Sequence, residues 1–327
     1  MTLRLLKYSS YTIHFNQNFS SSNHTYAKRE IYLMKFIDET GIEFISEAAP
    51  LPPFSKETKT DIIDSLSKIL NAVINLDTIT NDPYSLPPSI KYGIEQAFLY
   101  KSIQGCNPLI IFNYPKTIFV NSLFSLNQKF SEDIFQTVKI KIGNNFSNEL
   151  EIIKNIPSEV KIRLDVNGLW DLETAKKNLE ILSQIKNIEY IEDPCRTIED
   201  NIELGAEKLV KIAIDYNCRS NDDIKKLERI DEIDFLILKP SLSGSLFELA
   251  DIITKNRKKI IITSAFESYL TRHSLILLAS LLSHNYAHGL STSTFIKNDI
   301  SEELYLIRNG EIKIDSLKYP KKFLINI

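Results

Sequence analysis

The chain has 327 residues, of which 43% are hydrophobic and 25% are charged, a composition typical of an ordinary globular protein of about two domains. Its net charge of −3 excludes the basic surplus with which nucleic-acid-binding proteins neutralise phosphates. The longest apolar stretch, 275–282, is interrupted by Ser280 and is far shorter than the about 20 residues of a membrane-spanning helix. We therefore expect neither nucleic acid nor a membrane as a partner.

The N-terminal residues and the cysteines favour a cytoplasmic location. Residues 1–7 carry charges within their apolar run and are followed by no small-residue cleavage site, so they do not resemble a signal peptide. Cys106, Cys195 and Cys218 are odd in number and form no CxxC pair. This pattern argues against both a disulfide framework and a thiolate zinc site.

The first hundred residues predict a mixed α+β unit. A segment rich in Asn and Ser, 16–23, predicts a mobile loop between two strands. Apolar residues at helical spacing predict a helix over 56–75, and a second helix follows the proline pair at 87–88. The predicted strands are 2–15, 26–38 and 42–47.

From about residue 115 onwards, short β-branched runs alternate with helical stretches. This alternation indicates βαβ units and a parallel sheet, and eight such units close a barrel of 200-odd residues. The final stretch, 303–314, predicts a strand pair around Asn309-Gly310. The predicted barrel strands are 117–120, 138–142, 160–166, 190–192, 209–214, 235–238, 260–263 and 289–293, and helices are expected over 171–186, 222–229 and 246–257.

Polar residues end most of these apolar runs at a regular interval. Successive members are separated by 24, 27, 23, 24 and 25 residues, which is one strand-plus-helix unit each time. In a barrel of parallel strands the carboxyl ends of the strands carry the reactive groups, so these side chains are expected to share one mouth. They are Lys141, Asp165, Glu192, Asp215, Lys239 and Ser264.

Three of these residues suit a divalent cation. Asp165, Glu192 and Asp215 would present hard oxygen ligands on adjacent strands, which favours Mg²⁺ over zinc. Without a cation, three ionised carboxylates in a half-buried mouth would repel one another. The sequence therefore predicts a magnesium site.

The lysines that flank the acids suit proton transfer. A lysine acts as a base only when its pKa falls from about 10.4 towards neutrality, and a neighbouring cation or burial lowers it. Lys139 and Lys141 are two residues apart on one strand, so they point to the same face. The competing interpretation is that each polar residue is a solvated strand cap, with Asp165 to Gly168 a turn and Glu192 to Pro194 a strand exit.

Five motifs resemble the enolase superfamily, and its muconate-lactonising branch in particular. They are VKIKIG at 138–143, RLDVN at 163–167, IEDPC at 191–195, AID at 213–215 and LKPSLSG at 238–244. Residues 41–55 and SAFES at 264–268 are similar to the o-succinylbenzoate synthase family within it. The similarity extends over nearly the whole chain.

The resemblance implies an enolase-like α/β fold of two domains. Residues 1–100 would form an α+β capping domain whose loop at 16–23 is the active-site lid. Residues 101–300 would form a (β/α)₇β barrel related to the TIM barrel, and the tail 301–327 would return to the capping domain. The implied partner is a small-molecule carboxylate substrate.

The implied reaction is the syn dehydration of 2-succinyl-6-hydroxy-2,4-cyclohexadiene-1-carboxylate to o-succinylbenzoate, a step of menaquinone biosynthesis, through a metal-stabilised enediolate. Mg²⁺, or Mn²⁺ in its place, would be the cofactor. The ligands implied by matching positions are Asp165, Glu192 and Asp215.

The resemblance also implies roles for the other residues. Lys141 would abstract the α-proton and then protonate the departing hydroxyl, while Lys239 would stabilise the planar anion with its charge. Lys139 would lower the pKa of Lys141. Arg163 and Asn167 would support the ligands, and the loops at Ser264 and Gly289 would contact substrate.

Two other activities remain open from the sequence. An N-acylamino-acid racemase or dipeptide epimerase of the same branch would use Lys141 and Lys239 as opposed bases, and a non-catalytic barrel would use neither. The chain also departs from the family beside two ligands. It has Asp193 where Glu or Gln is common, and Asp215-Tyr-Asn where Asp-Glu-Ser is common. Both changes concern the groups that orient the ligands.

Overall fold

The computed structural model describes residues 1–21, 24–52, 54–103, 117–124, 135–282, 285–301, 307–314, 319 and 323–324. Cys106 and residues 303–306 of the predicted C-terminal strand pair lie outside the described residues. Within them, no helix combines the length and the apolar character that crossing a membrane requires.

The N-terminal residues form a four-stranded antiparallel sheet in the order β3-β2-β1-β4. Its two long strands pair from Leu3 with Asp38 to Ser21 with His24, so the chain remains extended where a loop at 16–23 was expected. That expectation was wrong for residues 16–21. The β1–β2 register shifts between His14 and Phe19, and residues 19–21 pair with β2 again, so the strand continues past this irregularity despite the turn preference of Asn and Ser. The strands are β1 (Thr2–Ser21), β2 (His24–Asp38), β3 (Glu43–Ala48) and β4 (Val73–Asn75).

Three helices accompany this sheet: α1 (Lys59–Ile69), α2 (Leu76–Asn81) and α3 (Pro88–Ile103). The helix predicted over 56–75 is shorter than expected at both ends. Thr58 begins it with a capping box in which Thr58 and Asp61 bond each other's backbone N–H groups. Beyond it, Val73 and Ile74 pair with Arg4 and Leu3, because β-branched residues there find a free sheet edge.

The middle of the chain forms a parallel sheet in the order β12-β11-β10-β9-β8-β7-β6. Two isolated parallel bridges, Thr263 with Gly289 and Val120 with His288, link its two edges through residues 288–289 and curl it into a barrel. Together with the antiparallel sheet this confirms the enolase-like α/β fold. The strands are β6 (Ser122–Phe124), β7 (Thr137–Lys141), β8 (Lys161–Asp165), β9 (Ile188–Glu192), β10 (Ile212–Ile214), β11 (Phe235–Leu238) and β12 (Lys259–Ile262).

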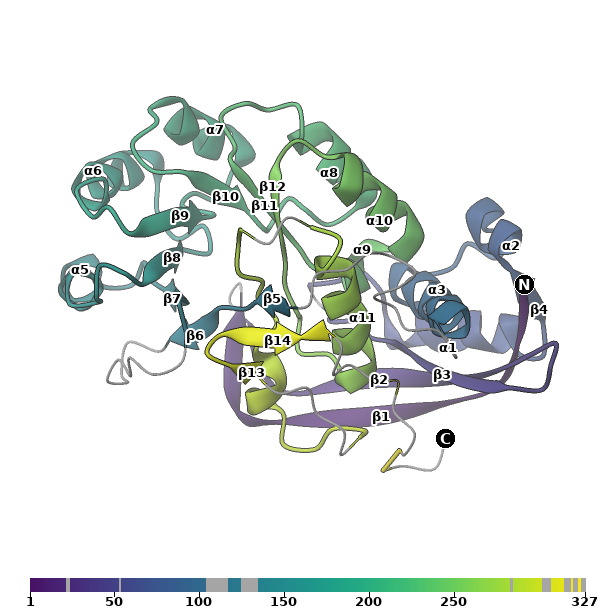
Figure 1. Cartoon of the computed structure of the whole chain (residues 1–327). Helices are drawn as coiled ribbons and strands as arrows, with labels where there is room; N and C mark the ends of the chain where they lie inside the picture. Colours follow the sequence, from purple (N-terminus) through teal and green to yellow (C-terminus); the bar gives the residue numbers. More distant parts are fainter. Residues whose placement is uncertain are drawn as a thin grey trace.

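Helices cover the outside of the barrel, and its strands are therefore buried on both faces. All four residues of β11, Phe-Leu-Ile-Leu, are buried, which is why such strands appear in the sequence as continuous apolar runs. In Figure 1 the teal and green strand–helix units lie to one side of the purple N-terminal strands. The helices are α5 (Phe146–Lys154), α6 (Leu172–Leu182), α7 (Ile198–Ala206), α8 (Asn221–Leu227), α9 (Pro240–Ser243), α10 (Leu246–Lys255) and α11 (Tyr269–Ala279).

A small antiparallel sheet, β13-β14-β5, changes two predicted assignments. The run at 117–120 was expected to be a barrel strand, but β5 (Thr117–Phe119) pairs with β14 (Glu311–Lys313), and β13 (Ile307–Arg308) completes the hairpin around Asn309-Gly310. The weak strand expected at 289–293 contributes only its first residue to the barrel, because a 3₁₀ helix, η1 (Thr292–Phe295), follows. Further along, the Tyr319 hydroxyl contacts the backbone of Ile45 in β3.

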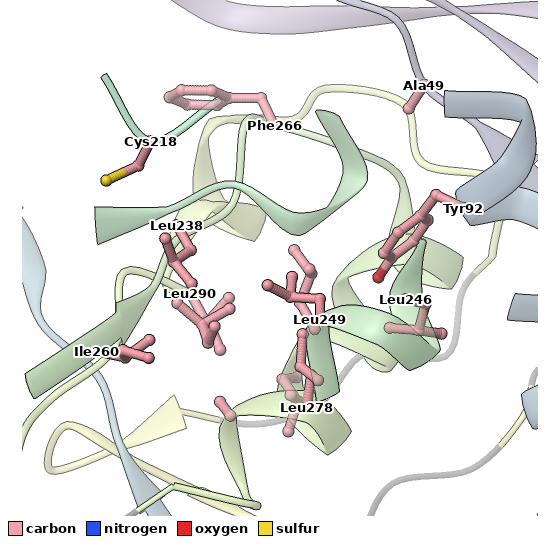
Figure 2. Close-up of a cluster of buried hydrophobic side chains, with 14 of the residues drawn as sticks. Ala49, Tyr92, Cys218, Leu238, Leu246, Leu249, Ile260, Phe266, Leu278 and Leu290 are labelled. Atoms are coloured by element: carbon pink, nitrogen blue, oxygen red, sulfur yellow. The ribbon is translucent and has the colours of Figure 1, made fainter. Parts of the chain in front are cut away.

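One hydrophobic core joins the N-terminal sheet to the barrel. Helix α3 lies between them, in contact with β3 on one side and with α9 and α10 on the other. Figure 2 shows part of this core, where Tyr92 of α3 lies beside Leu246 of α10, Leu290 lies near Leu238 of β11, and Leu249 and Leu278 belong to the same cluster. The two parts are therefore packed as one body, and the mouth of the barrel is held beneath the N-terminal sheet.

Gly205 in α7 offers a test of this packing. A Cβ atom there would lie 2.2 Å from the oxygen and 2.9 Å from the carbon of the Glu232 backbone carbonyl, so the chain itself would have to shift. Helix propensity alone predicts that Gly205→Ala stabilises the protein by about 1 kcal/mol. We expect the opposite sign, a loss of more than about 1 kcal/mol in the free energy of unfolding, measured by urea denaturation.

Lys177→Ala, at an exposed position of α6, is the control and should change the free energy of unfolding by less than about 0.5 kcal/mol. A stabilised Gly205→Ala variant would show that α7 does not pack against the 232 segment as described.

Candidate active site

The parallel register brings the predicted polar residues to one end of the barrel. Lys141 is aligned with Asp165, and Asp165 with Glu192, on three successive strands. Glu192 is aligned with Ala213, and Asp215 comes two residues later, directly after β10 ends. Lys239 directly follows β11. All these residues therefore leave the sheet at its carboxyl edge, where the loops of a barrel build its site.

Carboxylates cluster at this edge. Oxygen atoms of Glu192, Asp193 and Asp215 all lie within 4.8 Å of one another. Asp165 is connected to this group through Lys139, whose ammonium lies 2.9 Å from Asp165 Oδ2 and 2.7 Å from Glu192 Oε1. Asp165, Glu192 and Asp193 are buried, so their charges must be balanced within the protein.

Lysines provide that balance from two sides. Lys139 pairs with Asp165 and Glu192 on one side, and Lys239 donates to both carboxylate oxygens of Asp215 on the other. Lys141 lies one strand away from Asp165 and also lines the cavity. The three lysines and the carboxylates thus form one continuous charged floor.

Electrostatics differentiate the two lysines of β7. Burial by itself would lower the pKa of Lys139, but the charges of Asp165 and Glu192 hold that pKa well above its ordinary value. For Lys141, burial in the barrel mouth lowers the pKa, and the charges of Lys139 and Lys239 lower it further against the opposing pull of Asp165. Of these two neighbours, Lys141 is the one disposed to lose its proton.

The acids are also perturbed. Burial raises the pKa of Glu192 to about 7, and the charges of Asp165 and Asp215 add to the rise while Lys139 opposes it. Burial, together with Asp215 and Glu192, raises the pKa of Asp193 well above its ordinary value. Strong perturbation of neighbouring acids in a cavity is typical of functional sites.

Asn167 and Asp193 hold two of the predicted ligands, Asp165 and Asp215, through direct hydrogen bonds. Asn167 Nδ2 donates to Asp165 Oδ1 over 2.8 Å, and Asp193 accepts from the backbone N–H groups of Asp215 and Tyr216 over 3.2 and 2.9 Å. Both residues have positive φ angles, 54° and 42°, so each marks a sharp departure from its strand.

Arg163 lies deeper in the barrel than the other predicted residues. Its buried guanidinium donates to Glu189 Oε2, to Asn121 Oδ1 and to the backbone oxygen of Ala287. None of these hydrogen bonds is to the three predicted ligands, and Arg163 is not among the residues that line the cavity. It contacts two residues that do line it, Asn121 through a hydrogen bond and Tyr190, whose ring centroid lies 5.0 Å from the guanidinium carbon.

Ser264 and Gly289 lie together on the opposite wall. Ser264 Oγ donates to Glu267 Oε2 over 2.7 Å and accepts from Thr292 Oγ1 over 2.8 Å. Gly289 is aligned with Thr263, whose Oγ1 would be 2.4 Å from a Cβ atom at that position, so the close approach of the two chains requires glycine. Both residues line the cavity.

The site occupies a cavity of about 480 Å³, within the usual range for small-molecule sites. Its charged floor is covered by apolar and aromatic side chains from both parts of the protein. The N-terminal part contributes the apolar side chains of Leu51 and Phe54, and also the polar side chain of Asn18. The apolar side chains from the barrel include Phe124, Ile237, Ile261, Phe266 and Phe295.

Two kinds of residue escaped the sequence reasoning. Asp193 was considered as part of a strand exit and as a departure from the family pattern but not as a site residue, although it belongs to the acidic cluster. Its position directly after Glu192 could have indicated a place in the site. The backbone turns sharply at Asp193, and such a turn can direct a residue just beyond a strand end into the barrel mouth. Leu51 and Phe54 gave none, since their place over the barrel depends on how the two parts pack.

The donor set fits a divalent cation. Glu192 Oε2 is buried and has no hydrogen-bond partner, although a buried carboxylate oxygen ordinarily has one. Oxygens of Glu192, Asp193 and Asp215 lie within 4.8 Å of one another, and Asp165 is connected to Glu192 through Lys139. Hard oxygen donors are the ligands that Mg²⁺ prefers. We conclude that the residues present can accept such an ion.

Comparisons with known proteins identify the family to which the chain is similar. Residues 125–317 match the family model described as "Enolase C-terminal domain-like". The o-succinylbenzoate synthase of Thermobifida fusca is 25% identical over 199 residues, which is 58% of this chain and 62% of that protein. The o-succinylbenzoate synthase of Pectobacterium atrosepticum is 27% identical over 269 residues, 78% and 80% of the two chains. The matched region thus spans less than two thirds of the first relative.

Solved structures show the same fold. An o-succinylbenzoate synthase from Thermosynechococcus elongatus with Mg in the active site superimposes with a TM-score of 0.74 at 20% identity, covering 87% of this chain and 92% of that one. A dipeptide epimerase from Enterococcus faecalis with Mg and L-Leu-L-Tyr gives 0.81 at 16% identity, covering 96% and 97%. At such identities the likeness concerns the fold alone. Since the family model spans more than half of the sequence, the chain belongs to the enolase C-terminal domain-like family of the enolase superfamily.

Proposed function

We propose that this chain is a magnesium-dependent o-succinylbenzoate synthase, which removes water from 2-succinyl-6-hydroxy-2,4-cyclohexadiene-1-carboxylate. The observation that carries the proposal is the convergence of buried carboxylates, flanked by Lys141 and Lys239, on the floor of one cavity. The names of the relatives support the choice of substrate. The place of the reaction in menaquinone biosynthesis follows from that choice.

Asp165, Glu192 and Asp215 would hold Mg²⁺, or Mn²⁺ in its place. When bound, the cation supplies positive charge beside the substrate carboxylate, where negative charge grows as the neighbouring carbon loses its proton. Asn167 keeps Asp165 in position, and Asp193 keeps the backbone of Asp215 in position, so the ligands are oriented by hydrogen bonds of their own.

Lys141 carries out both proton transfers in this proposal. In its neutral form its Nζ takes the proton from the carbon that bears the carboxylate, and the electron pair of that C–H bond moves towards the carboxylate, which becomes an enediolate. The resulting ammonium then gives the proton to the departing hydroxyl, the C–O bond breaks as the electron pair moves into the ring, and water leaves behind an aromatic ring. Because one lysine serves both steps, the proton and the hydroxyl leave from the same face.

Lys239 and Lys139 act through charge. Lys239 approaches from the opposite side of the acids and would stabilise the planar anion. Lys139 stays protonated because Asp165 and Glu192 hold its pKa high, and its fixed charge helps to keep the pKa of Lys141 low. The apolar walls exclude water from the ring and strengthen both effects.

Racemisation or epimerisation of an N-acylamino acid or dipeptide is the second candidate, favoured by the placement of the two lysines. Lys141 is the last residue of β7 and Lys239 directly follows β11, and the three strands that lead to the acids, β8, β9 and β10, lie between them. Opposed lysines could exchange an α-proton on either face. Exchange of that proton with solvent deuterium for both stereoisomers, without loss of water, would favour this activity over the dehydration.

Replacing either lysine tests the roles directly. We expect Lys141→Ala to lower kcat by at least the ~10²–10⁴-fold that general acid–base catalysis contributes, measured by the absorbance change on formation of the aromatic product. Lys239→Ala should also lower kcat strongly. Lys161→Ala, at the opposite end of the same sheet, is the matched control and should retain activity.

A fall of less than about tenfold in Lys141→Ala would remove this residue from the role of base. Activities that are the same in all three variants, at a level above buffer, would assign the reaction to other residues. If the unsubstituted chain shows no turnover with Mg²⁺ present, the dehydration itself is wrong.

The cation site can be tested without any substrate. We expect Mg²⁺ to raise the melting temperature, because an ion that binds only the folded chain stabilises it by mass action. Asp215→Asn should weaken Mg²⁺ binding in titration calorimetry, since it removes one ligand charge. Asp251→Asn, an exposed acid of α10, is the control and should bind as tightly as the unsubstituted chain. Equal affinities in both variants would exclude Asp215 as a ligand.

A further inference from the structure

A buried arginine joins the N-terminal sheet to the wall of the cavity. Arg29 of β2 is only 2% exposed, and its guanidinium donates to the backbone oxygens of Ala49 and Pro50, at the end of β3, and of Ala265, in the loop after β12. Arginine presents several donors in a fixed planar fork, so one side chain can hold three carbonyls from two distant segments. Leu51, which lines the cavity, directly follows Pro50.

Glu267 forms the other half of this contact. Its carboxylate lies 3.8 Å from Arg29 Nη1 and is fully buried. It accepts from Ser264 Oγ over 2.7 Å and from the backbone N–H of Ala265 over 2.8 Å, and it also accepts from Ser241 Oγ. Arg29 and Glu267 therefore hold the same short loop at Ala265. Arg29 binds the backbone oxygen of that residue, and Glu267 binds its backbone N–H group.

The loop that they hold is strained. Phe266 has a φ of +66°, a backbone conformation that is rare for a bulky side chain and persists only where surrounding contacts enforce it. Its ring lines the cavity and packs against Phe15 of β1 and Phe295 of η1, with centroids 5.5 and 5.9 Å apart. Contacts on both sides of Phe266 thus fix an aromatic wall of the site.

We propose that Arg29 is a positioning residue, which with Glu267 holds the loop 264–266 so that Phe266 and Ser264 meet the substrate. The inference rests on the proposed function. Arg29 does not line the cavity, and it acts on the wall and not on the lysines that move protons. The contact of Glu267 with Ser241, two residues beyond Lys239, does not involve Arg29 and remains in its absence. Arg29 consequently governs substrate binding more than the chemical step.

Steady-state kinetics of Arg29→Gln test the assignment. Because misplacing a binding wall weakens binding, we expect KM to rise at least about tenfold with kcat within about threefold of the unsubstituted chain. The dissociation constant for o-succinylbenzoate, measured by calorimetry with Mg²⁺ present, should rise by a similar factor. Arg29→Lys keeps the positive charge but loses the planar guanidinium, so its KM should lie between those of the unsubstituted chain and Arg29→Gln.

Tyr100→Phe is the matched control. The buried Tyr100 hydroxyl of α3 donates to the backbone oxygen of Leu270 in α11 over 2.6 Å, so it also ties the N-terminal part to the barrel but lies away from the cavity. We expect this variant to keep KM within about twofold. An equal rise of KM in Tyr100→Phe would show that any loosened contact between the two parts has the same effect, and would overturn the proposal.

A second substitution separates positioning from folding. Glycine adopts a positive φ without strain, so in a Phe266→Gly background the loop no longer needs the clamp. We expect Arg29→Gln to raise KM less than about threefold there, against at least tenfold in the native background, which is the coupling that neighbouring residues show. Equal effects in both backgrounds, or failure of both Arg29 variants to fold, would contradict the proposal. Absence of turnover by the unsubstituted chain would instead refute the proposed function.

Discussion

The structure depends on one electrostatic constraint, the burial of several carboxylates at the carboxyl edge of a parallel sheet. Each ion taken out of water costs several kcal/mol unless an opposite charge compensates it, so Asp165, Glu192 and Asp215 require cations close by. Lys139 and Lys239 meet part of that need from two sides. The unpartnered oxygen of Glu192 marks where a metal ion would meet the rest.

The same constraint explains why neighbouring lysines behave differently. Lys139 lies between two buried acids, whose charges raise its pKa so that it keeps its proton. Lys141 is two residues further along the strand, where burial and the charges of Lys139 and Lys239 lower its pKa. A spacing of two residues puts both on one face of the strand, and both line the cavity, but Lys141 is the more exposed of the two. A base and the charge that tunes it can thus come from a single strand.

The cavity is complete only when both parts of the protein are packed. Its floor comes from barrel strands, while Leu51 and Phe54 from the segment after β3 cover it. Arg29 joins that segment to the barrel loop at Ala265. Substrate selection is therefore expected to reside in contacts between the two parts, while the chemistry resides in the barrel, where strand register keeps the reacting groups in place.

The sequence by itself determined the alternation of strands and helices and the step of about 25 residues between polar strand ends, because burial on both sheet faces leaves uninterrupted apolar runs. Only the tertiary structure decided that residues 16–21 extend as strand, that Val73 leaves the helix for a sheet edge, and that 117–119 pairs with β14. It also decided the depth of Arg163 and the place of Asp193 among the acids. The spacing of apolar residues within an element indicates which side of it is buried. The segment that packs against that side comes from a distant part of the chain, so no local pattern predicts it.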